Sequence, residues 1–80
     1  MIRGRNIKDL GIHPQNCPFC KDSDLYIDDG SDYCGQGFNV YYIEIACLKC
    51  GLTIKSDMTE PTKENFIKLI ENWNKIRIKE

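Results

Sequence analysis

Two pairs of cysteines constrain the fold of this chain more than any other feature of its sequence. Residues 17–20 (C-P-F-C) and 47–50 (C-L-K-C) are both C-x-x-C segments. Two residues between cysteines allow a tight turn that aims both sulfurs at one point, and two such turns can close a tetrahedron of thiolates, the geometry that Zn²⁺ prefers. The spacing therefore predicts one structural zinc site, whose ligands are Cys17, Cys20, Cys47 and Cys50.

Other chemistries use the same four side chains. A rubredoxin-like iron site also takes four thiolates, and a secreted protein would join the four cysteines in two disulfides. The basic start at residues 1–5 is followed by no apolar run of the kind found in signal peptides, which favours reduced cysteines in the cytoplasm. A thioredoxin-like redox pair needs a βαβ unit, for which this chain is too short. Zinc is favoured, and iron stays an alternative.

The chain has 80 residues, of which 41% are hydrophobic, so we expect a single small domain over residues 1–80. A core of this size is marginal on its own, and a metal is a common way to stabilise it. No stretch approaches the roughly 20 apolar residues of a membrane span. We therefore expect a zinc-dependent α+β domain that is neither membrane-bound nor stable without its metal.

The order of patterns predicts a zinc ribbon followed by a packing helix. We expect an N-terminal arm over residues 1–16, a ribbon over 17–56 and a helix over 62–79. The Asp-Gly pair in residues 28–31 is a strong hairpin signal, and the aromatic and β-branched residues favour strands. The ribbon is thus predicted to be a three-stranded antiparallel sheet, with strands at residues 25–27, 38–46 and 52–55.

The C-terminal segment has the pattern of an amphipathic helix. Thr62 is a good N-cap, and Glu64 in the first turn suits the positive end of the helix dipole. Apolar residues recur at helical spacing and predict one buried stripe, formed by Phe66, Leu69, Ile70, Trp73 and Ile76.

In the strand expected at residues 38–46, successive side chains point to opposite faces of the sheet. Tyr41, Ile43 and Ile45 share one face, and Tyr42, Glu44 and Ala46 share the other.

Charge is distributed in blocks although the net charge is only −1. Residues 22–44 hold six acids and no Lys or Arg, together with several tyrosines. Such a block suits the basic surface of a partner protein. The candidate partner-binding residues are Asp28, Asp29, Asp32, Tyr33, Tyr42 and Glu44, and the candidate phosphate-contacting residues are Arg3, Arg5 and Lys8. Two further residues are expected to be bystanders of the metal site: His13, and Cys34, the fifth cysteine.

Several motifs occur in one order: Cys-Pro-Phe-Cys, a strand entering the second C-x-x-C-Gly, and Ile70-x-x-Trp73-Asn74 on the last helix. In this order the chain resembles the Lar-type restriction alleviation proteins, small zinc-ribbon proteins encoded by phages and prophages. The resemblance spans residues 17–75. The family usually has Gly after the first cysteine pair, where this chain has Lys21, and an arginine where this chain has Ile76.

The resemblance implies an anti-defence role, in which the protein helps phage DNA escape a host restriction system. The residues themselves indicate a binding module, because a Cys₄ zinc site has no open position and no other catalytic set is apparent. We expect a host defence or DNA-handling protein as the partner and no small-molecule substrate. The alternatives are a nucleic-acid-binding ribbon, which would contact DNA weakly through the N-terminal bases, and a structural adaptor of a larger complex.

Overall fold

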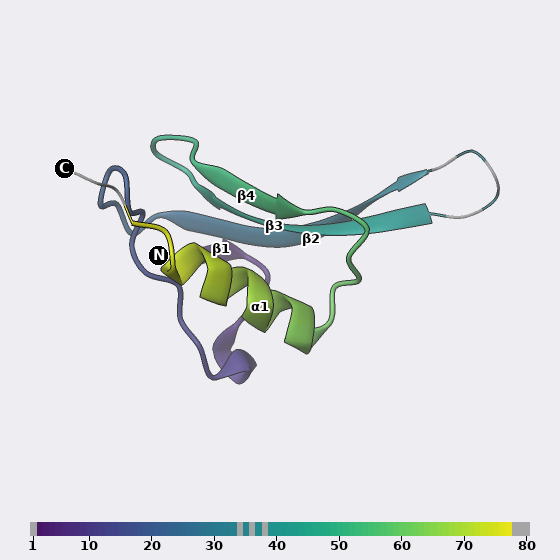
Figure 1. Cartoon of the computed structure of the whole chain (residues 1–80), viewed down its shortest axis with the longest axis horizontal. Coiled ribbons are helices and arrows are strands. Elements are labelled where there is room, and N and C mark those ends of the chain that lie inside the picture. The colour runs from purple at the N-terminus through teal and green to yellow at the C-terminus, as the bar shows by residue number, and fades with distance from the viewer. Residues whose placement is uncertain (1, 34, 36, 38, 78–80) are drawn as a thin grey trace.

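The computed structural model describes residues 2–33, 35, 37 and 39–77. Its elements, in chain order, are β1 (Ile2–Gly4), the 3₁₀ turn η1 (Lys8–Leu10), β2 (Leu25–Tyr33), β3 (Asn39–Cys47), β4 (Thr53–Ser56) and α1 (Lys63–Asn74). The strands form one sheet in the order β1-β2-β3-β4. Helix α1 and the segment that contains η1 lie on the same side of this sheet, and no element formed by the described residues covers the opposite side (Figure 1).

Strands β2 and β3 form the long hairpin that organises the sheet. Their register runs from Leu25 opposite Cys47 to Tyr33 opposite Asn39. The burial of β3 alternates as the sequence predicted, with Ile43 and Ile45 fully buried. On the buried face, Leu25 and Ile27 of β2 complete this layer of the core. The hairpin continues past the first turn of α1, so the outer part of the sheet projects from the body of the molecule (Figure 1).

The expected turn at residues 28–31 is wrong, because this segment continues β2. Cross-strand pairing with residues 41–44 of β3 overrides the local turn preference of Asp-Gly. Gly30 instead leaves room for an aromatic ring: a Cβ at this position would lie only 2.4 Å from the Tyr42 hydroxyl oxygen. The missing side chain thus lets the ring of Tyr42 lie across the neighbouring strand.

The sheet is four-stranded and mixed, so the predicted three-stranded antiparallel sheet is also wrong. Strand β1, within the segment expected to be an arm, pairs in parallel with β2, from Ile2 opposite Leu25 to Gly4 opposite Ile27. A Cβ at Gly4, where φ is +90°, would lie 2.2 Å from the Ile27 carbonyl oxygen, so only glycine permits this approach. Ile7 then enters the core and anchors the segment.

Helix α1 begins as predicted and ends earlier than expected. The Thr62 side chain accepts a hydrogen bond from the N–H of Asn65 at 3.2 Å, and four residues of the predicted stripe are buried: Phe66, Leu69, Ile70 and Trp73. Helical structure stops at Asn74, and residues 75–77 continue without it, whereas the expected bound was residue 79. The buried stripe packs against β3 and β4.

Candidate metal centre and open sheet face

The four cysteines predicted to bind metal lie together at one end of the sheet. The Sγ atoms of Cys20 and Cys47 are 3.4 Å apart, those of Cys17 and Cys50 are 3.5 Å apart, and all four lie within 4.8 Å of one another. These separations exceed the roughly 2.05 Å of a disulfide bond. Cys17 and Cys47 are buried, whereas Cys50 is exposed. The cluster is suited to zinc, since four thiolates at one point match its preferred tetrahedral shell.

Both cysteine pairs use the same backbone turn, which we call a knuckle (residues 17–22 and 47–52). The N–H of the first cysteine donates to the carbonyl of the last residue of its knuckle, from Cys17 to Asp22 at 2.9 Å and from Cys47 to Leu52 at 2.8 Å. The carbonyl of the first cysteine accepts from the N–H four residues later, that of Lys21 at 2.8 Å and that of Gly51 at 3.0 Å. The N–H of the second cysteine points at the first sulfur, at 3.5 Å in both. The C-x-x-C spacing therefore builds two equivalent pairs of ligands.

The left-handed residue that closes each knuckle differs between the two. Gly51 has φ of +83°, and the equivalent Lys21 has φ of +65°. A side chain in this region costs energy that glycine avoids. The Lys21 ammonium donates to the Pro18 carbonyl at 3.2 Å, which ties the side chain back across its own turn.

The hydrogen bonds of the knuckles also set the acidity of the thiols. Burial raises the pKa of Cys47, but hydrogen bonds from the backbone N–H groups of Cys50 and Lys49 and from the Cys20 thiol outweigh it and lower the pKa to about 7. The N–H of Asp22 lowers the pKa of Cys20, whereas burial and the other three thiols raise it, giving a pKa of about 12. Four thiols this close cannot all ionise alone, and a bound dication removes that restriction by holding them as thiolates.

A set of hydrogen bonds between Gln15 and the end of α1 positions the first knuckle. The Gln15 amide group donates to the carbonyls of Trp73 (2.9 Å) and Ile76 (3.1 Å), and the Trp73 indole N–H donates to the Gln15 carbonyl at 2.9 Å. The Asn74 side chain accepts from the Gln15 N–H at 2.6 Å and donates to the His13 carbonyl at 3.1 Å. We call these contacts the Gln15 clamp. Sequence reasoning found Trp73 as a core residue and missed Gln15, whose partners lie 58 or more residues away.

Most of the candidate partner-binding residues lie on the sheet face that none of the described elements covers, which we call the open face. By strand register, Asp28 lies directly opposite Glu44 there, and Asp32 and Tyr42 lie farther along the same face. The Tyr26 hydroxyl donates to Asp28 at 2.7 Å, and this hydrogen bond is the main cause that lowers the pKa of the Asp28 carboxyl. Like charges directly opposite each other on two paired strands are destabilising, so the Asp28–Glu44 pair is expected to lower the stability of the sheet.

The remaining candidates are dispersed. Asp29 lies on the helix side of the sheet, where Arg5 donates to its carboxylate at 3.0 Å and also lies 5.1 Å from the centre of the Phe66 ring. Tyr33 ends β2 opposite Asn39. Arg3 pairs with Tyr26 in register at the edge of the open face, and Lys8 is exposed in η1. The three N-terminal bases therefore do not share one surface.

Two expectations fall outside these sites. Cys34 lies outside the described residues. The group that could hold a metal contains the four cysteines and does not include His13, whose backbone carbonyl accepts a hydrogen bond from the Asn74 side chain.

Comparisons with protein-family models, with curated proteins and with solved structures find no match for this chain. Among the described residues, α1 has only 12 residues, and no helix has the length and apolar composition that a membrane crossing needs.

Proposed function

We propose that this chain is a small zinc protein that binds a partner protein through the open face of its sheet. The observation that carries this proposal is the placement of Asp28, Asp32 and Glu44 beside Tyr26 and Tyr42 on the open face. Acidic groups beside aromatic rings suit a partner surface rich in Arg and Lys, because the charges steer the encounter and the rings supply contact area.

In this proposal the metal is structural. Four cysteine thiolates complete the tetrahedral shell of Zn²⁺ and leave no position at which a substrate or a water could be activated. The protein is then a binding module and not an enzyme. Zinc content measured on the purified chain tests this step, with one equivalent expected; one equivalent of iron would support the rubredoxin-like alternative instead.

The positions of the basic residues favour a protein partner over DNA. The cation of Arg5 is held by Asp29 at 3.0 Å, and Lys55 lies 4.1 Å from the centre of the Tyr42 ring and 3.5 Å from Asp57. On the open face itself, the strand register places three carboxylates, those of Asp28, Asp32 and Glu44, and two bases, Arg3 at the edge and Lys55. A nucleic-acid-binding surface needs the opposite balance of charge.

The cellular role that we propose is anti-defence, acting on a host restriction or other DNA-handling protein. It rests on the resemblance in motif order to the Lar-type restriction alleviation proteins and on the acidic open face, which suits the basic surface of a protein that binds DNA. The test is the plating efficiency of unmodified phage on restriction-proficient and restriction-deficient hosts that express this chain. We expect a gain only on the restriction-proficient host; equal plating on both would contradict the role in restriction.

A charge-reversal variant tests the open face separately from the fold. We expect Asp32→Lys with Glu44→Lys to abolish the plating gain while zinc content and thermal stability stay near those of the original chain. The matched control is Glu60→Lys with Glu71→Lys, which changes the net charge equally at two exposed positions, one before α1 and one within it. If both double variants lose activity alike, net charge and not the open face is responsible.

A further inference from the structure

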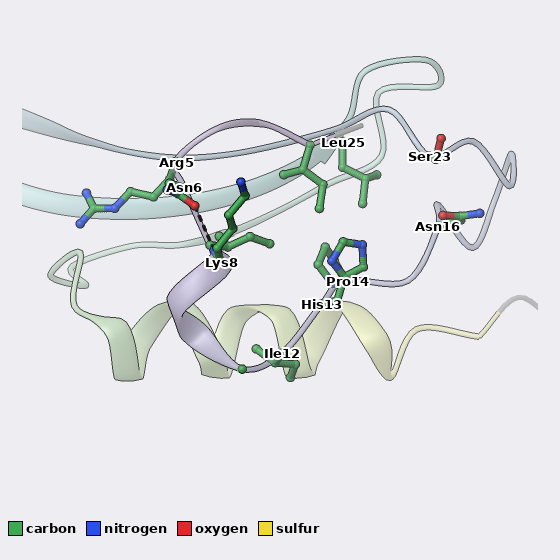
Figure 2. Close-up of a pocket in the computed structure, with 12 residues that line it drawn as sticks. Arg5, Asn6, Lys8, Ile12, His13, Pro14, Asn16, Ser23 and Leu25 are labelled. Atoms are coloured by element: carbon green, nitrogen blue, oxygen red, sulfur yellow. Dashed lines mark hydrogen bonds between the residues drawn. The ribbon is translucent and has the colours of Figure 1, made fainter.

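A pocket separate from the metal centre and the open face lies inside the N-terminal segment. It has a volume of about 550 Å³, and its walls come from β1, η1, the segment leading to the first knuckle, and the start of β2 (Figure 2). Small-molecule sites usually have volumes of about 300–1,000 Å³. The pocket exists because residues 2–16 pack against the sheet as an ordered segment.

The pocket combines apolar walls with positive charge. Its apolar lining residues are Ile2, Ile7, Ile12, Pro14 and Leu25, three of which, Ile7, Pro14 and Leu25, are buried. Arg5, Lys8 and His13 also line it, and no carboxylate does so among the described residues. This contrasts with the open face and selects for an anionic ligand with an apolar part.

Of the two permanent cations, Lys8 is the one free to meet a ligand. Arg5 is engaged by Asp29 at 3.0 Å, and its side chain turns away from the other lining residues in Figure 2. The Lys8 ammonium forms no ion pair within the described part of the chain. In Figure 2 its side chain runs up beside Asn6, and the His13 ring lies across the pocket, below Leu25.

We propose that this pocket binds a small amphipathic anion: one carboxylate or phosphate group attached to an apolar body of several carbons. The anionic group is held at Lys8, and the apolar body lies against Ile12, Pro14 and Leu25. Neither the anti-defence role nor the open face is needed for this site, so the two proposals can fail independently.

Titration of the purified full-length chain, followed by amide NMR, tests the site. The probes are octanoate and octyl phosphate, which share an apolar body and differ in the anionic group, with octylammonium as the probe of opposite charge. We expect octanoate, octyl phosphate or both to shift amides of residues 5–16, and octylammonium to leave them unchanged. The tighter of the two anions identifies the headgroup that the pocket prefers.

Variants of Lys8 decide whether the charge has the proposed role. Lys8→Gln should weaken binding about fivefold, the size expected for one surface charge pair, and Lys8→Arg should retain it. Lys68→Gln on α1, outside the pocket, is the matched control and should bind as the original chain does. Equal affinity of Lys8→Gln and the original chain, or equal shifts with octylammonium, would overturn the proposal; the same spectra report whether each variant is folded.

Discussion

The two knuckles share one local structure but are held in place by different means. The second knuckle is continuous with the sheet, because Cys47 is the last residue of β3 and the chain returns through β4. The first knuckle is preceded by an irregular segment that the Gln15 clamp fastens to the end of α1. A C-x-x-C turn thus specifies its own geometry, whereas the position of each turn depends on tertiary contacts.

Direct contacts also join the two knuckles. The N–H of Leu48 donates to the Asp24 carbonyl at 3.0 Å, and the Lys49 ammonium lies 3.7 Å from the Asp22 carboxylate. The ion pair is partly exposed and contributes little. The metal is therefore expected to be the main link that holds the knuckles together. We predict that loss of the metal affects both knuckles.

Metal removal should have the largest effect. A structural zinc contributes about 10 kcal/mol or more to folding at neutral pH, so a strong chelator should unfold the chain. Cys17→Ser and Cys47→Ser should each do the same, since each leaves an incomplete ligand set in a buried place. Circular dichroism and zinc content measured together test this expectation.

The matched control for the ligand variants is Cys34→Ser, which changes a cysteine outside the two C-x-x-C segments. We expect it to leave both zinc content and folding intact. Loss of zinc from Cys34→Ser, or a folded chain after complete chelation, would contradict the assignment of the four ligands and their role.

Trp73→Ala should have the second-largest effect and should act through the first knuckle. The indole is fully buried, and its removal should reduce the free energy of unfolding by about 3–5 kcal/mol. Trp73→Phe keeps most of the apolar contact and removes the N–H that reaches Gln15, so a loss of about 1–2 kcal/mol is expected. Urea unfolding of the zinc-loaded chain measures both, and an unchanged transition for Trp73→Ala would contradict the buried position.

Gln15→Ala tests the clamp without opening a large cavity. It removes the two hydrogen bonds to the Trp73 and Ile76 carbonyls, and we expect a loss of about 1–2 kcal/mol. Zinc transfer to a chromophoric chelator should also become faster, because the first knuckle is less firmly held. Asn65→Ala is the control: it removes an exposed side-chain hydrogen bond at the other end of α1, to Glu60, and should leave the transfer rate unchanged.

The features predicted well from the sequence depend on neighbours close in the chain. The C-x-x-C spacing led to the cysteine cluster, and the Thr62 cap and the apolar stripe led to α1. The alternation of β3 correctly separated its buried face from the open face. In each case one local pattern determines which side chains turn inward.

The features that were missed depend on distant partners. Residues 28–31 carry a local turn signal, but pairing with β3 makes them a strand. Strand β1 has only three residues and gains its structure from a parallel pairing with β2, for which its own sequence has no periodic signal. The bonds of Gln15 likewise link positions 58 or more residues apart, so no sequence window contains both partners.

The smallest predicted effect concerns the residue that closes each knuckle. Lys21→Gly should stabilise the chain by about 0.5–1 kcal/mol, because relief of a left-handed side chain outweighs the added entropy of glycine in the unfolded state. Gly51→Lys should destabilise by a similar amount through conformation alone, since a Cβ there meets nothing within 4 Å. Lys21→Ala keeps the unfavourable φ and removes only the bond to Pro18, so it should stay within about 0.5 kcal/mol of the original chain. If Lys21→Gly is no more stable than Lys21→Ala in urea unfolding, the first knuckle does not share the preference for glycine at its left-handed position that the common hydrogen bonds of the two knuckles imply.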